Sequence, residues 1–267
     1  MSNPTATTAR AFAGLILRDF RVLRRELGPF VVRVIMQPLL FLFVFTFLMP
    51  RIGQGSMMGG GTNFATVLLP GLMAVAIMFS GIAAVALPLS TEFGVTREID
   101  DRVMCPLPVI AVAFEKVCFS ALQSILAALL VLPLAYFIPS QPVEAHVSSW
   151  FMLVAVLVLA SLVAGALGLA IGANVEPRQI GLVFSIVVVP ITFLGCVYYP
   201  WALLYHVRWL QIAVLINPIV YMSEGLRAAL TPNVPHMPSA LILLALLISF
   251  ALLGWFGVRG FLRRVIS

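Results

Sequence analysis

The residues best suited to chemistry are the charged side chains of one short stretch, positions 89–108, which reads LSTEFGVTREIDDRVMCPLP. Two pairs of opposite charge lie four residues apart there, a spacing that places both members on one face of a helix: Arg97 with Asp101, and Glu98 with Arg102. Proline disfavours helix in the residue before it, so Pro106 ends this helix. The pattern predicts a short helix that either docks a soluble partner by ion pairing or serves only as a solvated connector.

The start of this helix carries residues with capping chemistry. Ser90 or Thr91 can accept hydrogen bonds from the first backbone N–H groups, and Glu92 in the first turn suits the positive end of the helix dipole. The charged side chains that such a helix would present are Glu92, Arg97, Glu98, Asp100, Asp101 and Arg102.

The rest of the sequence holds no other recognised chemical site. A phosphate-binding loop of the Gly-x-x-x-x-Gly-Lys-Ser/Thr type does not occur, and the one lysine, Lys116, precedes an apolar run. His146, His206 and His236 lie far apart, and no cluster has metal-ligand spacing. No carboxylate lies deep in an apolar run, as a proton relay would need. We therefore expect a chain that is not an enzyme and holds no cofactor or metal of its own.

The composition indicates that the chain is a membrane protein. Hydrophobic residues make up 62% of the 267 residues and charged residues 10%, and the mean hydropathy is +1.11, whereas soluble domains are nearer half apolar and a quarter charged. Uncharged runs long enough to cross about 30 Å of hydrocarbon recur along the chain without strand-like alternation. The sequence predicts an all-α membrane protein, one domain over 1–267, with six spans at 30–50, 64–88, 112–138, 149–173, 179–199 and 237–258.

The arginines set the orientation and explain the net charge of +6. Basic residues gather on one side of the predicted spans, and only Arg51, Arg208 and Arg227 fall on the other. The basic side is cytoplasmic by the positive-inside rule, so six spans place both termini in the cytoplasm. A basic balance of this origin does not indicate nucleic acid.

Two further segments have amphipathic patterns. Residues 10–27 place apolar residues at helical spacing on one face and arginines on another, which predicts an interfacial helix at the surface of anionic lipid. A signal peptide is the alternative, but its apolar core would be short and no cleavage site follows. Residues 200–236 are too apolar for a solvated external loop and predict short re-entrant helices between spans five and six, broken at Asn217-Pro218.

Small residues and one charge pair complete the pattern. Ala160, Ala164, Gly168 and Gly172 recur every four residues, which favours close packing either within the chain or against a second copy. Glu224 and Arg227 at i,i+3 spacing predict a structural ion pair, with direct substrate contact as the alternative.

The string LPGLMAVAIMFSGIAAVALPLSTEFGVTREIDDRVMCPLPVIAVAFEKV, residues 69–117, resembles the central segment of type-2 ABC exporter permeases. In that family a Pro-Gly opens the second span, which leads into a charged loop. The string CVYYPWALLYHVRWLQIAVLINPIVYMSEGLRAAL, residues 196–230, is similar to the family's external segment, with aromatic-Pro, Asn-Pro and Glu-Gly-x-Arg in order. Residues 103–105 and Glu115 depart from the usual pattern, which weakens a subfamily assignment.

The resemblance implies a half-transporter in a bacterial inner membrane. Two permease chains, which we expect to be a homodimer, would work with two copies of an ABC ATP-binding subunit that holds ATP and Mg²⁺. Residues 92–104 would match the coupling helix that enters a groove of the ATPase, and the loop with Glu176 and Arg178 would be a second, smaller contact. The matching external structural motif is Tyr199, Pro200, Asn217, Pro218, Glu224 and Arg227.

The sequence allows more than one class of cargo. An exporter of an amphipathic drug, antibiotic, lipid or glycolipid, hence an efflux or antibiotic-resistance role, is the first expectation. A polysaccharide exporter of the same architecture is the second. A secondary transporter or channel would want buried ionisable groups or inverted repeats, and a membrane enzyme would want a polar constellation at one leaflet; neither pattern occurs in the sequence. If phenylalanines and methionines of the spans line the pathway, they favour an amphipathic cargo.

Overall fold

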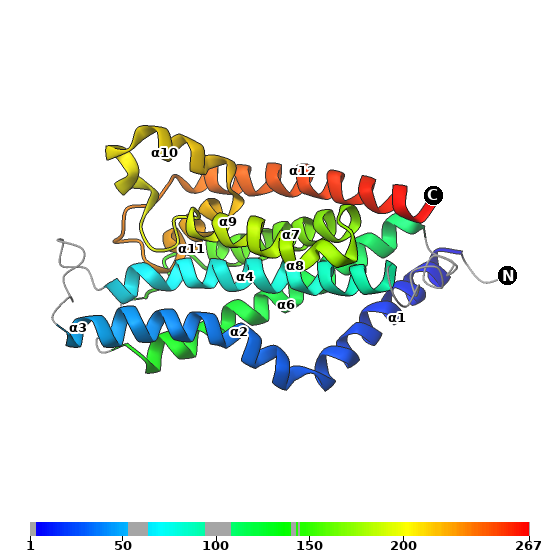
Figure 1. Cartoon of the computed structure of the whole chain (residues 1–267), viewed down its shortest axis with the longest axis horizontal. Helices are drawn as coiled ribbons and strands as arrows, with labels where there is room; N and C mark the ends of the chain where they lie inside the picture. The colour runs from blue at the N-terminus through cyan, green and yellow to red at the C-terminus, as the bar shows by residue number, and fades with distance from the viewer. Residues whose placement is uncertain (1–3, 53–63, 94–107, 140–142, 144, 267) are drawn as a thin grey trace.

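The computed structural model of the chain is almost entirely helical over the residues it describes, 4–52, 64–93, 108–139, 143 and 145–266. Within those residues no strand is present. The long helices are α1 (Pro4–Arg25), α2 (Leu27–Leu42), α4 (Phe64–Thr91), α6 (Val109–Phe137), α7 (Trp150–Asn174) and α12 (Ser239–Ile266). Most of them run along the long axis of the molecule, and α1 begins at the same end at which α12 finishes (Figure 1).

Shorter elements lie between these helices. A π-helical segment, η1 (Phe43–Leu48), and α3 (Met49–Arg51) continue α2. The second half of the chain contains η3 (Pro177–Gln179), α8 (Ile180–Val183), η4 (Phe184–Val188), α9 (Val189–Phe193), η5 (Trp201–His206), α10 (Arg208–Ala213), η6 (Val214–Ile216) and α11 (Pro218–Leu230).

Five segments of the described chain are long and apolar enough to cross a membrane: Leu27–Leu48, Phe64–Thr91, Val109–Phe137, Trp150–Asn174 and Ser239–Val265. Each overlaps a predicted span, so the all-α membrane architecture is confirmed. The predicted span at 179–199 is instead a shorter chain of helical pieces, Pro177–Phe193. Its helix ends at Phe193, and the backbone then turns at Cys196, whose φ of 51° lies in the left-handed region. The count of six spans stays a prediction.

The core lies between α4 and α7. In the most apolar window of each helix, 72% of α4 and 67% of α7 is buried inside the chain, against 17% for α2 and for α12. Apolar side chains that protein does not cover find an apolar partner in lipid, so the outer helices can stay apolar on their free faces. The central pair therefore fixes the bundle, and α2 and α12 form its lipid-facing sides.

Close contact of the two central helices depends on their small residues. A methyl group built on Gly168 would lie 3.0 Å from the Cα atom of Ile82, and one built on Gly172 would lie 3.0 Å from the Cα atom of Ala86. A methyl group on Gly81 would lie 2.5 Å from the Cβ atom of Ala164. The predicted small-residue face thus packs within the chain, against α4, and not against a second copy.

Gly168→Ala is expected to leave the chain about 1 kcal/mol less stable than Gly254→Ala. Both changes add the same helix propensity, but a methyl group at Gly254 meets nothing within 4 Å, whereas at Gly168 it presses on the backbone of α4. Thermal unfolding of the two variants in one detergent measures the difference. Equal midpoints for the two variants would mean that the α4–α7 contact relaxes without cost.

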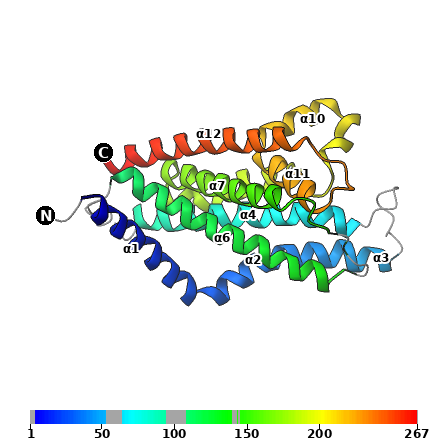
Figure 2. The ribbon, with the colours of Figure 1, turned by 180° about the vertical axis from the view of Figure 1, so that it is seen from behind.

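The first two helices form a V beside the bundle. α1 ends at Arg25 and α2 begins at Leu27, and the chain changes direction sharply between them (Figures 1 and 2). α1 contacts α6, and its Leu23 is buried, whereas Leu17 and Phe20 are exposed on the outer side. The predicted amphipathic helix at 10–27 is therefore present, and its position in a membrane surface stays a prediction.

The segment after the last turn of α9 forms the predicted short helices. η5, α10, η6 and α11 fold back over the end of the bundle where α12 begins (Figure 1). α11 is largely buried, and it contacts α4, α7 and α12. The break between η6 and α11 falls at Asn217-Pro218, as the sequence predicts.

Candidate functional site

The end of the bundle that carries residues 91, 109, 174 and 266 is called the basic end here. At this end, the Nζ atom of Lys116 in α6 donates a hydrogen bond of 2.7 Å to Oε1 of Glu92, which follows the last turn of α4. Both side chains are buried, with Glu92 and Lys116 each 5% exposed. The ion pair therefore links Glu92, which precedes residues 94–107 in the chain, to α6, which follows them.

Two expectations for this region need correction. The hydroxyl groups of Ser90 and Thr91 donate to the carbonyls of Leu87 and Pro88, so they belong to the last turn of α4 and do not cap a new helix. Glu92 is buried against Lys116 and is not part of an exposed charged face. The reason is that α4 continues to Thr91, three residues beyond the predicted end of its span.

The remaining charged residues predicted for the coupling helix lie outside the described residues: Arg97, Glu98, Asp100, Asp101 and Arg102. Their role stays a prediction.

The second predicted contact, after α7, is tied to the C-terminal helix. Nη1 of Arg264 in α12 donates to the carbonyls of Gly172, Ala173 and Val175, at 3.3, 3.4 and 3.0 Å. These carbonyls end a helix, where a cation is favourable. The loop beyond them forms η3, and its Glu176 and Arg178 are exposed, as a contact with a partner requires.

Arg264 also joins this loop to the end of α4. Its guanidinium lies 4.8 Å from the ring centroid of Phe93, and the rings of Phe93 and Phe261 are 5.8 Å apart. One side chain therefore links α12, the end of α7 and the end of α4. The sequence indicates Arg264 only as one of the basic residues on one side of the spans, although a basic residue in the last turn of a helix is a general signal for carbonyl capping.

At the opposite end, the predicted ion pair of Glu224 and Arg227 is present and wholly buried in α11. Glu224 accepts hydrogen bonds from the backbone N–H groups of Trp201 and Met237, at 2.9 and 3.0 Å. Arg227 donates to the carbonyl of Cys196 at 3.1 Å. The pair thus holds α11 to the chain before and after it, which is a structural arrangement that leaves no exposed surface for a substrate.

The Asn-Pro and aromatic-Pro motifs have local structural roles. Asn217 caps α11 by accepting from the N–H of Ile219 at 3.1 Å, and its amide donates to the carbonyl of Ile191 at 2.6 Å. Pro218 occupies the first turn of α11, where its missing N–H costs nothing. Tyr199 is partly buried, and Pro200 is buried directly before η5.

A tyrosine supports the same turn. The Tyr221 hydroxyl donates to the carbonyl of Leu215 at 2.8 Å. Burial raises the pKa of this phenol, so it stays a hydrogen-bond donor.

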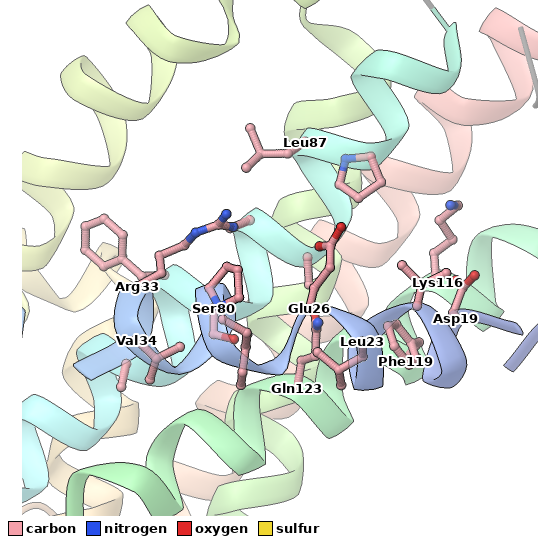
Figure 3. A pocket seen from close by; sticks show the side chains of 18 of the residues that line it. Asp19, Leu23, Glu26, Arg33, Val34, Ser80, Leu87, Lys116, Phe119 and Gln123 are labelled. Carbon is pink, nitrogen blue, oxygen red and sulfur yellow. The ribbon is translucent and has the colours of Figure 1, made fainter. Parts of the chain in front are cut away.

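A pocket of about 680 Å³ lies between the V of α1 and α2 and the facing sides of α4 and α6 (Figure 3), and Phe184 of η4 also lines it. It is called the elbow pocket below. Its apolar walls include Phe30, Phe79 and Ala84, while Glu26 and Arg33 reach into it from the elbow (Figure 3). The sequence analysis did not predict this site, because its lining comes from five separate segments.

This chain is similar in sequence to known proteins. The family described as ABC-2 type transporter matches residues 10–231. The inner membrane transport permease YadH of Escherichia coli (strain K12) is 28% identical over 241 residues, which cover 88% of this chain and 89% of that protein. YadH of Shigella flexneri matches with the same identity and coverage. Because the family match spans most of the chain and the helices fit a membrane protein, this chain belongs to the ABC-2 type transporter family.

Proposed function

We propose that the chain is the membrane-spanning permease subunit of an ATP-driven ABC exporter, which moves an amphipathic drug, antibiotic, lipid or glycolipid out of the cytoplasm or the inner leaflet. Two permease chains, as a homodimer, work with two ATP-binding subunits, which hold the ATP and Mg²⁺. The observation that supports the proposal best is the set of contacts made by Arg264, because they join both loops of the basic end to the bundle.

Mechanical coupling needs stiff connections between a docking surface and the spans. Lys116 fixes the start of the 94–107 segment to α6, and Arg264 fixes the 174–178 loop to α12. A partner that moved these loops would therefore move α4, α6, α7 and α12 with them. Such rigid-body motion is the ordinary route to alternating access.

The basic end is the cytoplasmic end in this proposal. Arg263 and Arg264 lie in the last turn of α12, and Arg178 lies in η3 directly after α7, so all three are at this end of the bundle. Arginine near the ends of spans is retained on the cytoplasmic side of a membrane. Both termini are then cytoplasmic, in a bacterial inner membrane.

The elbow pocket favours a small amphipathic cargo. Its volume of about 680 Å³ falls within the range of about 300–1,000 Å³ for sites of drug-sized ligands. A polysaccharide exporter of the same architecture is the alternative, and would show a continuous aromatic channel. Phe41, Phe45 and Tyr198 form an aromatic cluster, with ring centroids 5.2–6.3 Å apart, and this cluster is the observation that favours the alternative.

A secondary transporter would place its ionisable groups near the middle of the spans. Among the described residues of the spans, the buried charges Glu115 and Lys116 lie instead in the first half of α6, toward the basic end, and Glu92 directly follows α4 there. The other buried charges, Glu224 and Arg227, pair with each other in α11. An ATP-driven mechanism needs no such group, so the arrangement supports the exporter.

The test of coupling reverses charges on the predicted docking segment. Glu98→Arg or Arg102→Glu is expected to weaken docking of the ATPase by more than about tenfold, since like charges across an interface cost several kcal/mol. Export by proteoliposomes and pull-down of the ATP-binding subunit measure the two effects. Export per ATP hydrolysed should fall in both variants.

Arg208→Glu is the matched control, because Arg208 is exposed in α10 at the opposite end of the bundle. It should leave docking and export unchanged. The docking proposal fails if Glu98→Arg and Arg102→Glu both bind the ATPase and export as the wild type does.

A further inference from the structure

The elbow pocket holds polar groups that the protein itself does not satisfy. Ser80 of α4 lines the pocket and is only 8% exposed. Its hydroxyl group has no hydrogen-bond partner. None of the side-chain hydrogen bonds among the described residues involves Gln37 of α2 or Gln123 of α6, which also line the pocket. The unsatisfied hydroxyl of Ser80 costs free energy because it is buried away from water, whereas Gln37 and Gln123 are partly exposed. Together the three side chains favour a ligand with polar atoms.

Two charges at the elbow are also left for a ligand. Glu26 and Arg33 are seven residues apart, which is two helical turns, and both line the pocket. Neither forms an ion pair within the part of the chain that the structure describes. Lys116, the other cation named in this view, is held by Glu92 (Figure 3). Arg18 and Asp19 also line the pocket, and each has a partner within the protein, so Arg33 and Glu26 are the cation and the anion that remain available among the described lining residues.

Much of the remaining lining is apolar, although Arg18, Asp19 and Thr91 also contribute to it. The apolar part comes from all sides of the pocket, with Phe30 and Val34 on α2, Phe79 and Ala84 on α4, and Phe184 on η4. A ligand that satisfies the polar groups must therefore also carry an apolar portion.

We infer that the elbow pocket binds an amphipathic molecule with a zwitterionic head group, its anionic group at Arg33 and its cationic group at Glu26. Ser80, Gln37 and Gln123 bond the polar atoms that join the head group to the tail, and the tail lies against Phe79 and Phe184. The inference deepens the proposed function, on which it rests, because it names the chemical class of the cargo.

Three amphipaths with the same tail test the charge preference: dodecylphosphocholine, dodecyl phosphate and dodecyltrimethylammonium. Each is titrated into the full-length chain in a non-ionic detergent, and bound adducts are counted by native mass spectrometry. The zwitterion should bind about two- to fivefold more tightly than either of the other two probes, since it alone makes both charge-assisted contacts and each such contact at an exposed site contributes a gain of that size.

Two variants separate the two charges. Arg33→Gln should bring the affinity for dodecylphosphocholine down to that for dodecyltrimethylammonium, measured on the same variant, because the phosphate then has no cation. Glu26→Gln should remove the preference for dodecylphosphocholine over dodecyl phosphate. Both residues are exposed, so the fold is retained, and an unchanged thermal midpoint checks this.

The control variants are Arg21→Gln and Ala84→Phe. Arg21 is exposed on α1 outside the pocket, so its loss should change nothing. Ala84→Phe fills the apolar wall and should weaken all three probes alike. Equal affinity of the wild-type chain for the three probes, or wild-type preference in both charge variants, would overturn the inference.

Binding in this assay needs neither nucleotide nor partner. A chain that keeps the charge preference but exports nothing would contradict the proposed function and leave the pocket assigned. A second titration, in nanodiscs with added phosphatidylethanolamine, identifies the source of the ligand. Displacement of dodecylphosphocholine by that lipid assigns the site to a bilayer lipid, and retention assigns it to a cargo of the same head-group chemistry; either result supports the zwitterionic site.

Discussion

Arg227→Met is expected to lower the free energy of unfolding by about 3–5 kcal/mol, because removal of one partner leaves the Glu224 carboxylate as an uncompensated buried charge. Glu224 and Arg227 are both 0% exposed. Methionine keeps most of the volume of the arginine chain, so the loss reports charge and hydrogen bonds more than packing. Thermal unfolding in detergent, followed by near-UV circular dichroism, measures the shift.

The loss should reach beyond α11. Glu224 accepts from the N–H groups of Trp201 and Met237, and Arg227 donates to the carbonyl of Cys196. Removal of the guanidinium frees that carbonyl and weakens the hold on the chain before η5. Limited proteolysis should therefore cut the variant between residues 194 and 207 faster than it cuts the wild type.

Arg208→Met is the matched control, since Arg208 is exposed in the same segment. It should shift the unfolding midpoint by no more than a surface substitution does, within about 0.5 kcal/mol. A midpoint for Arg227→Met equal to that of Arg208→Met would show that the buried pair contributes nothing to stability.

The long apolar helices could be predicted from the sequence because hydropathy acts locally. Uncharged runs near 20 residues have few solutions in lipid other than a helix, so α2, α4, α6, α7 and α12 follow directly. The same holds for the seam of Gly168 and Gly172, since a four-residue repeat of small residues reports close helix packing. The break at Asn217-Pro218 follows from capping chemistry.

The ends of the helices were harder to predict, for a physical reason. Ser90 and Thr91 look like the start of a new helix, but their hydroxyls donate to carbonyls of the turn before them. A hydroxyl group can accept a hydrogen bond from the N–H groups of a helix that follows it, or donate one to a carbonyl of the turn before it. The sequence does not show which of the two it does. The turn at Cys196, which follows α9, is a backbone feature without a sequence signature for that residue type.

Contacts between distant segments lay beyond sequence reasoning altogether. Lys116 and Glu92 are 24 residues apart, and Arg264 is about 90 residues from the carbonyls that it caps. The elbow pocket combines α1, α2, α4, α6 and η4. Such sites depend on how helices pack, and a single sequence gives the faces of helices but not their partners.

Lys116→Met is expected to lower the free energy of unfolding by about 1.5–3 kcal/mol, the range for a hydrogen bond to a charged group. The ammonium lies 2.7 Å from a carboxylate that is 5% exposed, so water replaces it poorly. In the assembled transporter the change should also lower export per ATP hydrolysed, because α6 no longer follows movement of the 94–107 segment. Thermal unfolding and proteoliposome export measure the two effects.

A charge swap separates the pair from its individual members. Glu92→Lys combined with Lys116→Glu keeps an ion pair at the same place, so it should recover part of both the stability and the export lost in Lys116→Met. A double-mutant cycle with Glu92→Gln, Lys116→Met and their combination gives the coupling energy of the pair, expected at about 1 kcal/mol or more. A coupling energy near zero, or a swap that is no better than the single changes, would mean that the two ends of the 94–107 segment are held by other contacts, and the mechanical role given to Lys116 would be lost.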